Sequence, residues 1–360
     1  MSDERTRQYA RLLVDTCVDA QPGWQVLVVG TPHGRPLLEE IGRAVARRGA
    51  YAVFQLSFGG TLGAADASWL RAAPMELIAR PSALQVHLIE QCDAMISVDA
   101  PENTRDASSV EQERLAAAQA AYRPAIQRLL SDELPWVGCQ FPTPALAQDA
   151  GMSTGEFADF LFDACLLDWE AEGKRMQRYA DRFDSAEEVW IVGDRTDLRL
   201  SLAGRRMEVD AGGGNMPGGE FYGCPVEDSA EGEIVFGEFP AIYQGRELNG
   251  IRLRFESGRV IDASADSNEA FLLQVLDRKG ARGLGELGVG CNPGITRYMK
   301  NTLFDEKIDG TVHLALGNGF PNLGGTNEST IHWDIVKDLR EGGRILLDGE
   351  VVQESGRWLV

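Results

Sequence analysis

The stretch WQVLVVG (residues 24–30) is a short apolar run that ends in glycine, and it decides how the first half of the chain folds. An amphipathic segment, PLLEEIGRAVARRG (36–49), follows it, and a second apolar run, YAVFQLSF (51–58), comes next. Apolar runs of this length alternating with helical periodicity predict buried parallel strands joined by helices. The pattern continues with expected helices at about 82–91 and 110–130 and expected strands at 94–100 and 136–142.

The second half of the chain has a different texture. After an expected helical stretch at about 155–182, short β-patterned segments are separated by glycine-rich turns, and IRLRFESGRVIDASAD (251–266) alternates apolar and polar residues. Such alternation is typical of half-buried antiparallel strands. The sequence therefore predicts an α/β protein: an N-terminal doubly wound parallel-sheet domain in residues 1–185 and an α+β domain in residues 186–360.

Composition excludes several classes of protein. The chain has 360 residues, ordinary globular hydrophobicity and a net charge of −20. A surface this acidic repels phosphate backbones, so we expect no nucleic-acid partner. No apolar stretch is long enough to span a membrane and the first residues lack the layout of a signal peptide, so we expect a cytoplasmic protein. The six cysteines form no CxxC pair, which argues against disulfides and a cysteine zinc site, although Cys224 and Cys291 lie near the motifs described next.

Four short stretches of the C-terminal half are rich in side chains that bind metals. NMPGGE (215–220) ends in Glu220, and GLGELGVGCNPG (283–294) presents Glu286 among glycines. FDEKIDGTVHLALG (304–317) and TIHWDIV (330–336) contribute the remaining candidates, which are Asp305, Glu306, His313, His332 and Asp334. The other two histidines, His33 and His87, lack carboxylates at useful spacing, and we expect them to be structural or on the surface.

Strand geometry brings some of these side chains together. Residues i and i+2 of a strand point to the same face, so His332 and Asp334 should share one side while Trp333 packs on the other. TVHLALG is also strand-like and leaves room beside His313. Imidazole and carboxylate groups together suit zinc, manganese, cobalt or iron. Four or more carboxylates with two histidines exceed what one ion needs and fit a pair of ions.

The segments TDLRLSLAGR, NMPGGE, GELGVGCNPG, NTLFDE, VHLALGNG and IHWD, in this order and spacing, resemble the M29 metallopeptidases, the thermophilic aminopeptidase T family. The likeness covers the C-terminal half, whereas the N-terminal half agrees only in its α/β pattern. It implies an aminopeptidase acting on small peptides or aminoacyl substrates, typically a homodimer, supported by two divalent ions (zinc, cobalt, manganese or magnesium). The metal ligands that it implies are Glu220, Glu286, Glu306, His313, His332 and Asp334, with Glu286 and Asp334 bridging.

Two departures from the family pattern bear on the site. The seven positions that separate Glu306 from His313 exceed the family's spacing, which leaves Asp305 and Asp309 as alternative ligands. The family tends to carry a tyrosine where this chain has Phe320, and a phenyl ring cannot donate a hydrogen bond to a developing oxyanion. For the proton that must pass from water to the leaving amine, Glu220 and Glu306 are both candidate carriers.

A second interpretation uses the same residues differently. Some M29-like proteins resemble 2,5-dihydroxypyridine 5,6-dioxygenase, a ring-cleaving enzyme with one Fe(II). His313, His332 and Asp334 could supply the two histidines and one carboxylate that hold such an iron. Glu220 and Glu286 would then be surplus negative charge beside a single ion, which is costly if buried and unpaired. We therefore prefer the metal-dependent aminopeptidase.

Overall fold

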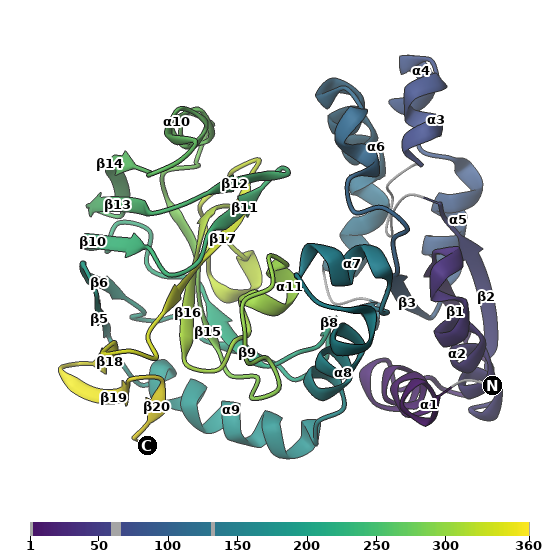
Figure 1. The fold of residues 1–360 in the computed structure, drawn as a ribbon, viewed down its shortest axis with the longest axis horizontal. Helices are drawn as coiled ribbons and strands as arrows, with labels where there is room; N and C mark the ends of the chain where they lie inside the picture. The colour runs from purple at the N-terminus through teal and green to yellow at the C-terminus, as the bar shows by residue number, and fades with distance from the viewer. Residues whose placement is uncertain (1–2, 59–65, 131–133, 360) are drawn as a thin grey trace. The chain divides into compact units, whose positions relative to one another are not determined.

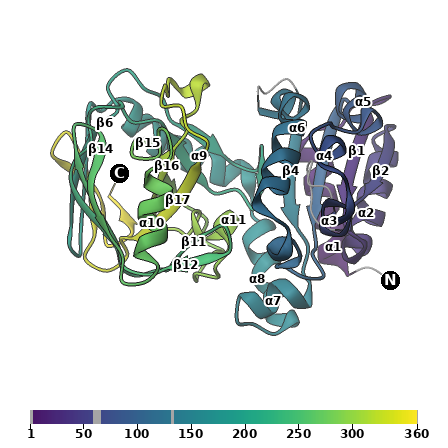
Figure 2. The ribbon, with the colours of Figure 1, turned by 90° about the horizontal axis from the view of Figure 1, so that it is seen from above.

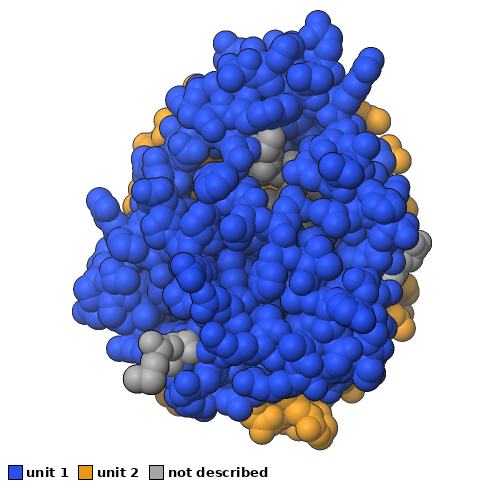
Figure 3. Space-filling view, turned by 90° about the vertical axis from the view of Figure 1, so that its right-hand side faces the viewer, with its two compact units in different colours: residues 1–167, 212–218 blue, residues 168–211, 219–360 orange. Residues whose placement is uncertain are grey.

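The computed structural model describes residues 3–58, 66–130 and 134–359 (Figure 1). The chain forms two compact units, coloured separately in Figure 3: unit 1 is residues 1–167 and 212–218, and unit 2 is residues 168–211 and 219–360. This division differs from the expected boundary near residue 185 by one helix. Helix α9 (Trp169–Asp184) buries Met176 and Phe183 in the core of unit 2.

Unit 1 is built on a parallel sheet of five strands in the order β2-β1-β3-β4-β8. The strands are β1 (Gln25–Gly30), β2 (Tyr51–Leu56), β3 (Ala94–Asp99), β4 (Trp136–Gln140) and β8 (Asn215–Met216). The quoted stretch at 24–30 therefore forms β1, a central strand with two parallel neighbours. The expected parallel α/β sheet is confirmed, except that its edge strand β8 comes from the glycine-rich segment that precedes Glu220.

Helices lie on both faces of this sheet (Figures 1 and 2). Helix α1 packs against α2 and α8, whereas α5 packs against α6. The helical elements of unit 1 are α1 (Glu4–Arg11), η1 (Leu12–Cys17), η2 (Pro32–Gly34), α2 (Arg35–Arg47), α3 (Ala67–Ala72), α4 (Met75–Ile78), α5 (Ala83–Gln91), η3 (Asp106–Ser109), α6 (Gln112–Leu130), α7 (Pro144–Asp149) and α8 (Thr154–Cys165). The expected helix at 155–182 is thus two helices, α8 and α9, one in each unit. Within residues 3–58, 66–130 and 134–359, no helix is long and apolar enough to cross a membrane.

Unit 2 contains two antiparallel sheets and a small hairpin. The larger sheet has the order β14-β13-β10-β6-β5-β18-β19-β20, and the smaller has the order β17-β16-β15-β9-β7. The strands of the larger sheet are β5 (Glu188–Gly193), β6 (Thr196–Ser201), β10 (Glu231–Phe236), β13 (Ile251–Glu256), β14 (Arg259–Ser264), β18 (Arg344–Leu347), β19 (Glu350–Glu354) and β20 (Arg357–Trp358). Those of the smaller sheet are β7 (Glu208–Asp210), β9 (Glu220–Gly223), β15 (Leu284–Gly290), β16 (Thr311–Gly317) and β17 (His332–Asp338).

The remaining elements of unit 2 are short. They are the hairpin β11 (Ala241–Tyr243) and β12 (Arg246–Leu248), and the helical segments α10 (Glu269–Leu276), α11 (Thr302–Asp305) and η4 (Pro321–Leu323). A single hydrophobic core joins both sheets, since Ile191 and Leu198 of the larger sheet belong to the same buried cluster as Leu287 and Leu314 of the smaller one. One face of the smaller sheet therefore packs in the core, and the candidate site lies on its other face.

Candidate metal centre

Five of the six candidate ligands lie on four neighbouring strands of the smaller sheet of unit 2. Glu220 begins β9, Glu286 lies on β15, His313 on β16, and His332 and Asp334 on β17. These strands are adjacent and antiparallel, with Glu286 opposite Ala315, which is itself opposite Asp334. Residues spread over 114 positions of sequence, from 220 to 334, are thus brought together by strand pairing.

Alternation along each strand separates the core face from the site face. On β16, Leu314 belongs to the hydrophobic core while His313 points to the other side, and on β17 Trp333 is in the core between His332 and Asp334. This confirms the sequence-based assignment of faces in TVHLALG and HWD.

Strand β15 reaches the same arrangement through an irregularity. Leu284 and Leu287 both belong to the core, although a regular strand would turn them to opposite faces. A register shift between Leu284 and Glu286 inserts Gly285 as an extra residue. Such a β-bulge re-aims the side chains that follow it, and here it turns Glu286 away from the core and toward the histidines.

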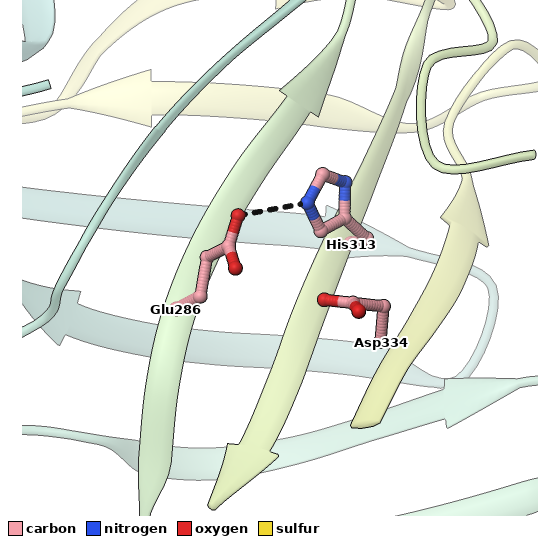
Figure 4. A group of neighbouring side chains, drawn as sticks. All are labelled: Glu286, His313 and Asp334. Carbon is pink, nitrogen blue, oxygen red and sulfur yellow. Dashed lines mark hydrogen bonds and ion pairs between the residues drawn. The ribbon is translucent and has the colours of Figure 1, made fainter. Parts of the chain in front are cut away.

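Glu286 lies between the two imidazoles. Its Oε1 is 3.2 Å from Nε2 of His313, and its Oε2 is 3.0 Å from Nε2 of His332. Nε2 of His332 is also 3.5 Å from Oδ1 of Asp334. Figure 4 shows Glu286, His313 and Asp334 converging from three strands, and one ligating atom from each lies within 4.8 Å of the others.

The other ring nitrogens fix the orientation of the two histidines. Nδ1 of His313 is 3.1 Å from the backbone oxygen of Glu306, and Nδ1 of His332 is 2.9 Å from the backbone oxygen of Asn318. Each Nδ1–H can donate to its carbonyl, so each Nε2 is directed at the carboxylates. Metal-binding histidines are commonly held in this way, with one nitrogen on a backbone carbonyl and the other on the ion.

A glycine makes room for the imidazole of His313. A Cβ atom added at Gly288, opposite His313 in the sheet, would lie 2.0 Å from both Cε1 and Nε2 of that ring. The ring therefore occupies the space directly over the Gly288 backbone. Gly288 lies two positions after Glu286 in the glycine-rich segment 283–294, and the site requires its lack of a side chain.

The electrostatics of the cluster favour bound positive charge. Burial alone would raise the pKa of Glu286, but hydrogen bonds from His313 and His332 outweigh burial and lower that pKa. Burial opposes protonation of the histidines, yet the hydrogen bond to Glu286 and the neighbouring carboxylates raise the pKa of His313 to about 10. The carboxylates of Asp334 and Glu286 raise the pKa of His332 to about 12. Without a metal, both rings hold protons at neutral pH.

Two buried carboxylate oxygens of the cluster have no hydrogen-bond partner: Oε2 of Glu220 and Oδ1 of Asp334. Nε2 of His313 lies 3.5 Å from Oε2 of Glu220. Buried polar atoms are almost always paired, and a bound ion is one recognised partner for those that are not paired within the protein. The donor set of imidazole and carboxylate groups is one that divalent transition ions accept, so these residues fit a metal ion.

Glu306 and the two aspartates considered as alternative ligands, Asp305 and Asp309, lie in three different surroundings. The Glu306 carboxylate contacts the ammonium of Lys307, and burial, with the charges of Glu220 and Asp334, raises its pKa although Lys307 lowers it. Asp305 instead accepts backbone hydrogen bonds from Met299 and Asn301 at 2.8 and 2.6 Å, which ties the last residue of α11 to the turn that precedes this helix. The nearest charged partner of Asp309 is Arg175, at 3.9 Å. Of the three, only Glu306 neighbours the cluster.

Sequence reasoning missed two residues beside the site. Lys307 is fully buried, and its Nζ lies 2.9 Å from Oε1 of Glu220. Tyr222 lies two positions after Glu220 on β9, its ring is 5.4 Å from that of Phe320, and its hydroxyl donates to Glu208 at 3.2 Å. The i, i+2 spacing of Glu220 and Tyr222 was a usable signal. The sequence around Lys307, which lies between a glutamate and an isoleucine near a helix end, gave no signal that this lysine belongs to the site.

The remaining candidates lie outside the cluster. His33 and His87 are exposed, as expected. Cys224 and Cys291 are buried, and burial raises the pKa of each thiol, which keeps both in the unreactive thiol form.

The profile of the thermophilic metalloprotease family M29 matches residues 2–358 of this chain. The chain therefore belongs to the M29 family, and it is a hydrolase. Aminopeptidase 2 of Geobacillus stearothermophilus is 28% identical to it, over 98% of this chain and 97% of its own length. The family assignment thus spans both units, whereas the sequence motifs pointed to it only through the C-terminal half.

Two solved structures share the fold. Wild-type AmpT of Thermus thermophilus aligns over 99% of both chains with a TM-score of 0.85 and 21% identity. A 2,5-dihydroxypyridine dioxygenase of Pseudomonas putida KT2440 aligns over 100% of this chain and 98% of its own with a TM-score of 0.63 and 15% identity. At such identities the likeness is one of fold, and the chemistry has to be argued from the site.

Proposed function

We propose that this chain is a metal-dependent aminopeptidase that removes N-terminal residues from small peptides or aminoacyl amides. The observation that carries the proposal is the convergence of Glu286, His313 and Asp334, with ligating atoms within 4.8 Å, in a member of the M29 family. Relatives that span most or all of the chain bear the names Aminopeptidase 2 and Aminopeptidase T. The expected homodimer and cytoplasmic location stay predictions.

Glu286, His313, His332 and Asp334 are the residues that we propose hold the ion. A divalent ion in such a site supplies two things: it lowers the pKa of water toward neutrality and polarises a carbonyl group. The choice among zinc, cobalt, manganese and magnesium depends on availability as well as on the ligands. His332, whose side chain is 31% exposed, lies at the open side of the cluster, and this is where we expect the peptide to enter.

Between the two candidate proton carriers, the surroundings favour Glu306. A general base works best when its pKa lies near the operating pH, and the pKa of Glu306 is raised from the ordinary carboxyl range. Both carboxylates contact Lys307, but Glu220 also directs its free Oε2 toward His313, which suits a ligand. The ring of Tyr222 lies 5.4 Å from that of Phe320 and carries the hydroxyl that Phe320 lacks, which donates to Glu208.

The test uses paired substrates. L-Leucine p-nitroanilide and its N-acetyl derivative would be incubated with metal-loaded protein and with protein treated with 1,10-phenanthroline. We expect hydrolysis of the free-amine substrate only, lost with chelator and recovered when zinc, cobalt or manganese is returned. Equal cleavage of the acetylated substrate would contradict an aminopeptidase, and chelator-resistant cleavage would contradict a metal-dependent one.

A ring-cleaving dioxygenase remains the second candidate because two histidines and Asp334 meet at the site in the combination that non-haem Fe(II) enzymes use. The carboxylates of Glu286 and Glu220 exceed that set, which is why it ranks second. Oxygen uptake by the Fe(II)-loaded protein with hydroxylated pyridines would distinguish the two activities. Uptake without peptide hydrolysis would replace the aminopeptidase proposal.

Metal binding should release protons, and its affinity should rise with pH. The raised pKa values of His313 and His332, about 10 and about 12, mean that both rings carry a proton at Nε2 at pH 7 in the metal-free protein. Each ring must lose that proton to bind an ion, so low pH opposes binding. We expect about two protons released per ion at pH 7, and an apparent Kd that falls as pH rises from about 6 to about 9.

Titration calorimetry in two buffers of different ionisation enthalpy counts the released protons. His87→Ala is a matched control, since His87 is an exposed histidine of unit 1. A Kd that does not change with pH, together with no proton release, would show that the histidines are not ligands.

A further inference from the structure

Lys307 is a buried cation inside the acidic cluster. Its side chain is 0% exposed, and its Nζ lies 2.9 Å from Oε1 of Glu220 and in contact with Oε1 of Glu306. An ammonium group taken out of water is costly unless carboxylates or other acceptors surround it. The two carboxylates therefore hold Lys307 in a defined place, between the strand that carries Glu220 and the end of α11.

The family resemblance implies six metal ligands. Once Glu286, His313, His332 and Asp334 hold the first ion, Glu220 and Glu306 are the two that are left for a second. The compact group of ligating atoms consists of Glu286, His313 and Asp334, and the described parts of the chain contain no other such group. Glu220 and Glu306 are instead joined through the Lys307 ammonium. One oxygen of Glu220 faces this ammonium, and the other, Oε2, lies on the side of His313. Glu220 thus lies between the proposed metal ion, on the side of His313, and the ammonium of Lys307.

The charges of the cluster agree with one ion. Glu220, Glu286, Glu306 and Asp334 carry four negative charges when ionised, and Lys307 carries one positive charge. With neutral, ligating histidines, a single divalent ion and the ammonium together compensate three of these four negative charges. The ammonium therefore takes over part of the compensation that a second ion would give.

We propose that this chain binds one divalent ion, and that the ammonium of Lys307 occupies the place of the second ion expected from the family resemblance. The inference rests on the proposed function only in assuming that the cluster binds a divalent metal. Its consequence is that Glu220 serves as a bridge between the ion and an ammonium. Lys307 is accordingly a positioning residue, because it acts through Glu220 and Glu306.

The first test is the metal content of the natural chain. Metal-free protein would be saturated with Mn²⁺, freed of unbound ion, and analysed by elemental analysis and by electron paramagnetic resonance. We expect about one Mn²⁺ per chain and the spectrum of an isolated ion. About two Mn²⁺ per chain with a spin-coupled spectrum would overturn the inference while leaving the aminopeptidase proposal intact. No bound metal and no peptide hydrolysis would overturn both.

The second test removes the ammonium. In Lys307→Ala, Glu220 and Glu306 lose their cation and space opens between them, so we expect about a second Mn²⁺ per chain and the appearance of spin coupling. The matched control is Lys337→Ala, because Lys337 is also buried and binds a carboxylate, that of Glu238, at 2.5 Å. It should keep about one ion.

Failure of Lys307→Ala to take up a second ion would overturn the claim that Lys307 fills that place. Thermal unfolding of both variants identifies loss of fold. If Lys307→Ala does not fold, Lys307→Met keeps the volume without the charge, and it should retain the isolated-ion spectrum with weakened binding. A coupled pair in the natural chain would overturn the inference.

Discussion

Replacing Glu286 with glutamine should remove both metal binding and activity while the chain stays folded. Glu286 is the residue that contacts both imidazoles, with Oε1 at 3.2 Å from His313 and Oε2 at 3.0 Å from His332. Glutamine keeps the shape but removes the charge, and its amide nitrogen would face one of the two rings as a competing donor. A metal ion contributes several kcal/mol of transition-state stabilisation, so we expect kcat/KM to fall by about three orders of magnitude.

The measurement combines metal content, kcat/KM on an aminoacyl p-nitroanilide and thermal unfolding of the metal-free protein. Glu238→Gln is the control, because Glu238 is a glutamate of the same unit that binds a buried lysine, Lys337, away from the cluster. It should change stability and leave metal content unchanged. If Glu286→Gln kept its metal and its activity, the cluster would be a structural network of hydrogen bonds and the function would have to be sought elsewhere.

Glu220→Gln provides a related comparison. Its Oε1 binds Lys307 and its Oε2 is the buried oxygen without a hydrogen-bond partner. Removing its charge should weaken metal binding and activity while the fold is preserved, and the contact with Lys307 adds a cost, because the ammonium loses one of its two carboxylate partners. Only Oε2 of Glu220 is directed toward the proposed ion, since Oε1 binds Lys307. We therefore expect Glu220→Gln to lose less metal than Glu286→Gln.

Strand periodicity accounts for what the sequence predicted of the site. The segment HWD fixes the faces of His332, Trp333 and Asp334 wherever it forms a strand, and the structure places Trp333 in the core and the other two on the site face. The same reasoning located His313. These features depend only on local geometry with period 2, so a sequence without any structure was enough to find them.

Features that depend on distant partners could not be found in this way. The bulge at Gly285 exists only in the pairing of β15 with β16. Lys307, in a run of acidic residues, has the pattern of a solvated helix end, and its burial follows from where Glu220 arrives from β9. The assignment of residues 212–218 to unit 1 likewise depends on β4, where Gly138 pairs with Asn215, 77 positions later in the sequence.

Gly288→Ala should disable the site through one added methyl group. The new Cβ would lie 2.0 Å from Cε1 and Nε2 of His313, atoms that cannot remain there. Gly288 is not among the glycines with positive φ, so alanine is compatible with its backbone and the cost falls on the imidazole. We expect the ring to be displaced from Glu286, metal affinity to fall by about 100-fold, and activity to fall with it.

A double-mutant cycle decides whether the effect passes through His313. If the methyl group acts only by displacing that ring, Gly288→Ala in a His313→Ala background should cost no further metal affinity, whereas independent effects would add. Gly155→Ala is the control, because a Cβ atom there meets nothing within 4 Å. Retention of metal by Gly288→Ala would mean that the sheet shifts to admit the methyl group, and that the place of His313 does not depend on the absence of a side chain at this position.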